Sequence, residues 1–203
     1  MTPLFPKLRL RVYAKIVKGN KIIMKSEILK IGGKMIDAKL EKAINEQINA
    51  ELYSEYIYLA MKTYFKENNL QGIANWFDVQ VQEEHAHAMG LYDYLIERNG
   101  HVELLPIDAP KLESDTIIGL FEQTLKHEMY VTSRINDLAD VAESVGDKAA
   151  ISFIDWYVKE QVEEEANVNN ILKTLKFIGD DKHALLLFDK DLAARTYVAP
   201  VIE

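Results

Sequence analysis

From Asp37 onwards, hydrophobic residues recur every three or four positions, which is the spacing of one face of an α-helix. The fourth of the stretches with this pattern is the most regular, with a stripe that advances in steps of three and four from Ile154 to Leu175. The connections after the first and third stretches are only a few residues long, so the helices that they join should be antiparallel neighbours. The pattern therefore predicts an all-α fold with long helices at about 37–68, 71–99, 114–144 and 147–177.

The connection between the second and third helices is much longer. Residues 100–113 follow the stop signal Asn99-Gly100 and contain Pro106 and Pro110, which keep them out of a helix. An extended segment of this length spans at most about 46–50 Å, and a helix of about 28 residues is about 42 Å long. The third helix, with Ser114 as its expected N-cap, can therefore start at the far end of the molecule. These lengths predict an antiparallel four-helix bundle with a long crossover between helices 2 and 3.

A short fifth helix is expected near 182–194, after Gly179-Asp180. It carries four leucines, but the core of a four-helix bundle leaves no room for it. The fifth helix should therefore pack against another subunit or against the end of the bundle, through Leu185, Leu186, Leu187 and Leu192.

Residues 1–34 have a different pattern and a different charge. Apolar and basic residues alternate from Leu8 to Lys15, and a second alternating run includes Ile22 and Met24, which is typical of a β-hairpin. A lone hairpin is marginal in water, so the segment is expected to be hairpin-like, extended or disordered. Codons for Gly32 to Met35 can also resemble a ribosome-binding site before an initiator methionine, so a non-native or mis-assigned start is an alternative. The predicted domains are a basic extension at 1–34 and a helical domain at 35–203.

Charge and composition exclude several classes of protein. The net charge of −8 hides an asymmetry, because residues 1–34 contain nine Lys/Arg and one acid, while the remainder contains 15 bases and 31 acids. An acidic body disfavours nucleic acid and attracts small cations. The chain has no cysteine, which rules out disulfides, zinc knuckles and thiol nucleophiles. No apolar run is long enough to span a membrane and no signal peptide is evident, so we expect a cytoplasmic protein.

Polar residues interrupt the apolar stripe of the second helix. Glu84 and His87 lie three residues apart on the same face as Phe77 and Leu91, which a helix buries. A buried carboxylate and imidazole are costly unless something compensates them. A divalent metal ion fits Glu-x-x-His spacing, whereas the simpler alternative is a helix edge where both side chains meet solvent.

The other three long helices carry the same kind of interruption near their middles. Glu51, Glu128 and the pair Gln161 and Glu164 fall in otherwise apolar stripes, and antiparallel packing would bring them to the level of Glu84. Converging carboxylates repel one another and take up protons. Two bound metals would resolve this, as in the di-iron carboxylate bundles with Glu from two helices and Glu-x-x-His from the other two. The fourth helix departs from that pattern with Gln161-x-x-Glu164.

Residues 35 to about 195 resemble a prokaryotic (bacterial or archaeal) non-haem ferritin. The motifs are Asn49-Ala-Glu-Leu-Tyr-Ser, Gln82-Glu-Glu-His-Ala-His, Lys126-His-Glu, Trp156-Tyr-Val-Lys-Glu-Gln-Val-Glu-Glu-Glu and Leu187-Phe-Asp-Lys-Asp-Leu. The resemblance implies iron storage and detoxification in a hollow homo-oligomeric cage of 24 subunits. It also implies ferroxidase activity, in which O₂ or H₂O₂ oxidises Fe(II) to Fe(III) and the ferric mineral is stored inside.

The resemblance also implies the ligands of two irons per subunit. One iron would be bound by Glu51, Glu84 and His87, and the other by bridging Glu84 with Glu128 and Glu164, beside Gln161. Tyr58 matches the tyrosine of the family next to the centre, where it could supply an electron, although a core tyrosine bonded to a carboxylate is an equal alternative. A third iron site would use Glu83, Glu160 and Glu163.

Other functions are weaker alternatives. A rubrerythrin-like peroxidase needs cysteine-ligated iron, and a bacterioferritin needs a second Glu-x-x-His and a haem-binding methionine, near whose position His85 stands. We therefore expect no haem, although a haem-binding variant, a cage-less di-iron oxidase or peroxidase and an iron-free scaffold remain as alternatives. His127 is expected to support Glu128 rather than to bind metal.

Overall fold

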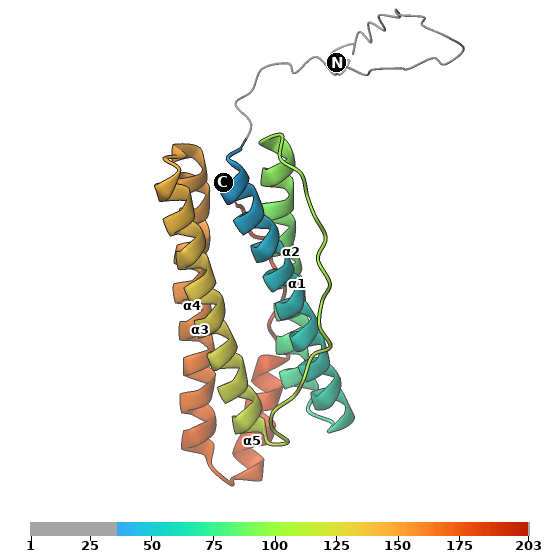
Figure 1. Ribbon diagram of the computed structural model, residues 1–203. Helices are drawn as coiled ribbons and strands as arrows, with labels where there is room; N and C mark the ends of the chain where they lie inside the picture. Colours follow the sequence, from blue (N-terminus) through green and yellow to red (C-terminus); the bar gives the residue numbers. More distant parts are fainter. Residues whose placement is uncertain (1–35, 203) are drawn as a thin grey trace, which may run out of the picture. The chain divides into compact units, whose positions relative to one another are not determined.

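The computed structural model describes residues 36–202, and the expectations for residues 1–34 lie outside this part of the chain. The described residues form helices and connecting segments without a strand, which confirms the predicted all-α class (Figure 1). Within residues 36–202, every helix is too short or too polar to cross a membrane. The helices are α1 (Ala38–Glu67), α2 (Gln71–Glu97), α3 (Ile117–Ser144), α4 (Lys148–Ile178) and α5 (Lys182–Leu192).

Side-chain caps account for where three of the long helices begin. Asp37 accepts from the backbone N–H of Lys39 at the start of α1, and Asp147 accepts from Ala150 at the start of α4. The predicted start of α3 was wrong by a few residues. Thr116, rather than Ser114, caps this helix by accepting from a backbone N–H in its first turn, because the Ser114 hydroxyl already accepts from Thr116 N–H.

The four long helices pack as two antiparallel pairs, α1 with α2 and α3 with α4 (Figure 1). Their buried apolar residues fall into two clusters, one towards each end of the bundle. Phe65, Phe77 and Phe121 belong to the cluster nearer α5, whereas Leu91 and Ile154 belong to the other. The polar residues of the four stripes lie at the level between these two clusters, so apolar packing isolates them from both ends.

The crossover runs along the length of the bundle beside α1 and α2, as predicted (Figure 1). Two asparagines of α1 hold its backbone. Asn45 donates to His101 O at 2.9 Å and accepts from Glu103 N–H at 2.8 Å, and Asn49 donates to Pro106 O at 3.0 Å. These bonds satisfy backbone groups of a segment that has no secondary structure of its own.

Helix α5 packs against the end of the bundle, which is one of its two expected positions. Asp189 of α5 is buried and accepts from Ile73 N–H at 2.8 Å, so it supplies a cap for α2 that Leu70 cannot provide. At Gly72 the two backbones approach so closely that a Cβ atom would lie 1.5 Å from Asp189 O. Of the four leucines, Leu185 and Leu192 pack against the core, whereas Leu186 and Leu187 are exposed.

The segment after α5 turns back along α2. Asn75 donates to the backbone carbonyls of Leu192 and Arg195. Further along, Ile202 reaches Gly90, where an added Cβ would lie 2.6 Å from its side chain. The C-terminal segment therefore runs along α2 from Asn75 to Gly90, past the level of Glu84.

Candidate metal centre

The polar residues predicted to meet at mid-bundle are all buried there. They come from the four long helices, and each is at most 5% exposed: Glu51, Glu84, His87, Glu128, Gln161 and Glu164. Carboxyl groups are rarely this buried without a partner of opposite charge or a metal. The alternative of a solvent-exposed helix edge for Glu84 and His87 is therefore wrong.

One half of the group is formed by Glu51, Glu84 and His87. Each offers a ligand atom within 4.8 Å of the other two. Among the described residues, Glu84 Oε2 and His87 Nε2 are the buried side-chain atoms that lack a hydrogen-bond partner. The hydroxyl of Tyr157 donates to His87 O at 2.9 Å and fixes the backbone there. An unpartnered carboxylate oxygen and an unpartnered imidazole nitrogen are the donor set that a divalent cation would use.

The other half is formed by Glu128 and Glu164. The Gln161 amide donates to Glu128 Oε2 at 3.3 Å, and the Gln80 amide donates to Glu164 Oε2 at 2.9 Å. Burial, followed by the charges of Glu128, Glu51 and Glu164, raises the pKa of Glu84, so this carboxyl group is close enough to interact with both halves. This central position suits a carboxylate that bridges two cations.

Burial holds protons on these carboxyl groups when no cation is bound. Burial and the charge of Glu164 raise the pKa of Glu128 to about 8, and burial raises the pKa of Glu164 to about 7. The pKa values of Glu51 and Glu84 are also raised, chiefly by burial. Burial lowers the pKa of His87 to about 4, so its imidazole is neutral at pH 7 and available as a ligand. A bound cation would therefore displace protons from the carboxyl groups.

Tyr58 borders the centre. Its buried hydroxyl donates to Glu128, and burial followed by the charge of Glu128 raises its pKa, so the phenol is neutral. The ring of Tyr58 meets the ring of His127 edge-on at 5.7 Å, and His127 Nε2 lies 2.8 Å from Ser54 Oγ. His127 therefore contacts Tyr58, the residue that donates to Glu128.

The three acids expected at a third site lie on one side of the centre. Glu160 Oε1 is 4.0 Å from His87 Nε2, and burial with the charges of Glu164 and Glu163 raises the pKa of Glu160 to about 7. Glu83 and Glu160 remain partly accessible, and Glu163 is exposed. Glu160 therefore lies next to the buried centre, whereas Glu83 is paired with Arg195 at 2.7 Å.

Sequence reasoning missed two glutamines that contact this group and two arginines that hold these glutamines. Gln47 and Gln80 donate to Glu51 and Glu164, and arginines 134 and 195 in turn donate to these two glutamines. Each glutamine lies one helical turn before a predicted ligand, Glu51 or Glu84, so spacing could have found both. The two arginines are far from these glutamines in the sequence, so no spacing pattern could have predicted their contacts.

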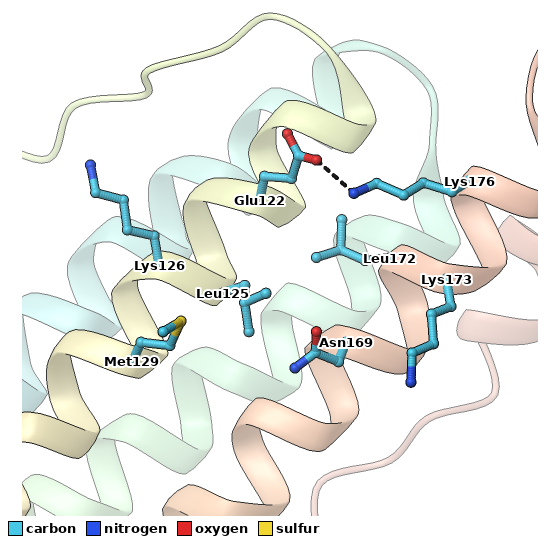
Figure 2. Close-up of a pocket in the computed structure, with 8 residues that line it drawn as sticks. All are labelled: Glu122, Leu125, Lys126, Met129, Asn169, Leu172, Lys173 and Lys176. Atoms are coloured by element: carbon cyan, nitrogen blue, oxygen red, sulfur yellow. Dashed lines mark ion pairs between the residues drawn. The ribbon is translucent and has the colours of Figure 1, made fainter.

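Two other features lie apart from the buried group. His85 is exposed and its Nδ1 lies 3.0 Å from Glu55 Oε2 on the surface. A surface groove between α3 and α4 is shown in Figure 2, and its carboxylate, Glu122, pairs with Lys176 at 2.8 Å. Two more lysines line this groove, Lys126 and Lys173, and it contains no histidine, so its chemistry does not suit a cation.

Comparison with known proteins gives consistent similarities. A ferritin-like domain model matches residues 41–178. The bacterial non-haem ferritin of Staphylococcus saprophyticus is 40% identical over 163 residues, which are 80% of this chain and 98% of that protein. The bacterial non-haem ferritin of Staphylococcus aureus is 37% identical, again over 80% of this chain and 98% of that protein.

Solved structures give the same picture. An open pore ferritin from the hyperthermophilic archaeon Archaeoglobus fulgidus superposes with a TM-score of 0.78 and 46% identity, over 79% of this chain and 98% of that chain. A closed form of the same ferritin, engineered by site-directed mutagenesis, superposes with a TM-score of 0.79. It is 45% identical, over 80% of this chain and 99% of that chain. The similarity thus covers nearly the whole length of each of these proteins.

Proposed function

The chain belongs to the ferritin family, whose function is iron storage with ferroxidase activity, and we propose that the buried mid-bundle group is its di-iron ferroxidase centre. The observation that carries the proposal is the pair of unpartnered buried atoms, Glu84 Oε2 and His87 Nε2, in a group of four buried carboxyl residues. The first Fe(II) is assigned to Glu51, Glu84 and His87. The second is assigned to Glu84, Glu128 and Glu164.

The residues around the ligands prepare them to receive Fe(II). Gln161 donates to the Glu128 carboxylate and Tyr58 donates to the same group, so both hold it in place. Neutral His87 supplies a nitrogen to the first iron, and entry of the two cations releases the protons that burial keeps on the carboxyl groups. Tyr58 stays neutral and keeps its proton, because burial and the charge of Glu128 raise its pKa.

The reaction is a two-electron oxidation of the substrate iron. Two Fe(II) become two Fe(III), and O₂ with two protons becomes H₂O₂; alternatively H₂O₂ with two protons becomes two waters. Ligation mainly by carboxylate oxygen favours the harder Fe(III) product. Glu83, Glu160 and Glu163 lie between the centre and the solvent and are assigned to a third, weaker site through which iron passes.

We further propose that the chain assembles into a homo-oligomeric cage, of 24 subunits as the resemblance to ferritins implies. Large hydrophobic side chains are exposed on the surface of the single chain, among them Tyr56, Met129, Val162 and Leu186. In a cage, contacts between subunits would cover such side chains. Size-exclusion chromatography with light scattering would give a particle near the mass of 24 chains; a monomer or dimer would instead support the cage-less oxidase.

The activity is tested by adding two Fe(II) per subunit in the presence of O₂ and following Fe(III) formation. Glu84→Ala should reduce the initial rate to that of buffer, because both iron sites lose the bridging ligand together. Glu97→Ala, an exposed glutamate on the same helix, is the matched control and should oxidise iron at the wild-type rate. A near-normal rate in Glu84→Ala contradicts the assignment of the centre.

A further inference from the structure

A buried glutamine connects the first iron site to an arginine. Gln47 is 1% exposed; its Nε2 donates to Glu51 Oε1 at 2.8 Å and its Oε1 accepts from Arg134 Nε at 3.2 Å. Arg134 comes from α3, donates to Glu46 O at 3.0 Å and lies over the ring of Tyr130, 5.8 Å from its centroid. The guanidinium is therefore held at several points.

The second iron site has the same arrangement, built from other parts of the chain. Gln80 is fully buried; its Nε2 donates to Glu164 Oε2 at 2.9 Å and its Oε1 accepts from Arg195 Nη1 at 2.6 Å. Arg195 lies in the segment after α5, over the ring of Trp76 at 5.0 Å from its centroid. It also donates to Trp76 O at 3.3 Å and to Glu83 Oε2 at 2.7 Å. The order Arg–Gln–Glu thus occurs twice, and we call each occurrence a relay.

The arginine determines which way round the amide lies. A glutamine amide has a donor end and an acceptor end, whereas a guanidinium has donors only. With its oxygen held by the arginine, the amide must present N–H to the glutamate. If the amide were flipped, its NH₂ group would face the donors of the guanidinium, and its oxygen would face the carboxylate of the glutamate. One carboxylate oxygen is therefore fixed by the amide, and the other is left for a metal.

We propose that Arg134 and Arg195 are positioning residues for the two iron sites, each of which orients one terminal carboxylate, Glu51 or Glu164, through the glutamine that it holds. The inference rests on the proposed di-iron centre and assigns one arginine to each half of it. It also gives the C-terminal segment a role, because Asn75 anchors the backbone that carries Arg195.

A third arginine provides a contrast within the same chain. Arg98 lies over the ring of Tyr94 at 5.4 Å from its centroid and pairs with Asp147 at 2.6 Å. It therefore shares the aromatic contact of the two relay arginines, but its carboxylate partner caps α4 and is not a candidate ligand. Loss of Arg98 removes an equally well-held guanidinium without touching a relay.

The test measures Co(II) binding without any oxidation. Calorimetry gives the affinities, and anomalous scattering at the cobalt edge from crystals at limiting Co(II) gives the occupancy of each position. Arg134→Met should lower the affinity of the His87-containing site, and Arg195→Met that of the Glu164 site, each on the order of 10–100-fold. Arg98→Met should change neither. Methionine keeps the apolar stem and removes the donors.

Two further variants separate positioning from charge or simple destabilisation. Gln80→Leu combined with Arg195→Met should weaken the second site no more than either change alone, because both break the same relay. Arg195→Lys should not restore the affinity, since an ammonium lacks the fixed fork that holds Gln80 and Glu83 together. Full rescue by lysine, or equal losses at both sites in each single variant, would overturn the proposal.

The wild-type protein separates this proposal from the one on which it rests. If wild type binds Co(II) at two positions and Arg134→Met and Arg195→Met bind it equally well, the relays have no positioning role, although the metal centre stands. If wild type binds no Co(II) between Glu51 and Glu164, both proposals fail together. Thermal unfolding of the metal-free variants checks that each is folded.

Discussion

At the scale of single residues, the centre is a set of carboxyl groups whose charge the fold suppresses until a cation arrives. Burial raises the pKa of Glu128 to about 8 and that of Glu164 to about 7. The unpartnered Glu84 Oε2 adds a further cost, because a buried polar atom without a hydrogen bond destabilises the folded state by about 1–3 kcal/mol. The metal-free protein is therefore less stable than it would be with this atom hydrogen-bonded, and the same atom is free to bind a metal.

The pH dependence of stability follows from these protons. At pH 6.5 the unfolded chain has lost its carboxyl protons, whereas the folded metal-free chain still holds most of those of Glu128 and Glu164 and releases them as the pH rises through about 7 to 8. The folded state binds more protons, so the free energy of unfolding should fall as pH rises, by on the order of 2 kcal/mol from pH 6.5 to 8. His87 and His127, with pKa values lowered to about 4 by burial, oppose this trend at the lower end of the window, because an unfolded histidine is about half protonated at pH 6.5.

Urea unfolding with EDTA at fixed protein concentration, at several pH values between 6.5 and 8, would measure this slope. Glu128→Gln should flatten it, because the variant lacks a carboxyl group whose pKa is raised to about 8 by burial and by the charge of Glu164. A wild-type stability that is constant or rises with pH over this window would show that the carboxyl groups are ionised without metal.

At the scale of helices, the sequence was sufficient to predict the four-helix bundle and the position of the polar site halfway along it. Apolar spacing predicted all five helices, and the polar breaks at Glu51, Glu84, Glu128 and Glu164 predicted their meeting, because antiparallel packing of similar helices aligns their middles. The start of α3 was misplaced because Ser114 and Thr116 are both good caps, and the choice depends on backbone geometry rather than residue type. The cap that Asp189 gives to α2 could not be predicted, since it joins residues far apart in sequence.

The contact between α5 and α2 can be tested at Gly72. Gly72→Ala places a Cβ 1.5 Å from Asp189 O, a backbone atom, so α5 must move away. Loss of the Asp189 cap should cost about 1 kcal/mol, and amide hydrogen exchange over 182–195 should become faster. Gln71→Ala, its exposed neighbour, is the control and should exchange like wild type. Unchanged protection of α5 in Gly72→Ala would contradict the close approach.

At the scale of the whole molecule, residues 36–202 contain all that the proposed function needs. The family match at 41–178 covers the four long helices except for the first three residues of α1, and it includes every proposed ligand. The return of the C-terminal segment along α2 was not predicted, because its anchors, Asn75 and Trp76, meet Arg195 only after the bundle has formed. Long-range docking of a short irregular segment leaves no periodic pattern in the sequence.

Deletion of residues 1–34 should therefore leave assembly and iron oxidation unchanged. The curated relatives are matched over 98% of their own length by 80% of this chain, and the proposed ligands all lie in α1 to α4. Light scattering and an iron oxidation assay on the truncated and full-length proteins would compare particle mass and rate. A smaller particle or a slower reaction would show that residues 1–34 contribute to the shell or the centre.

The most direct test of the di-iron centre is iron-edge anomalous diffraction from crystals soaked with Fe(II) under anaerobic conditions. We predict two strong peaks per chain at mid-bundle, about 3.5–4 Å apart. One should contact Glu51 and His87, the other Glu128 and Glu164, and Glu84 should contact both. A single peak, no peak at this level, or iron bound only at surface residues such as His85 would contradict the proposed centre.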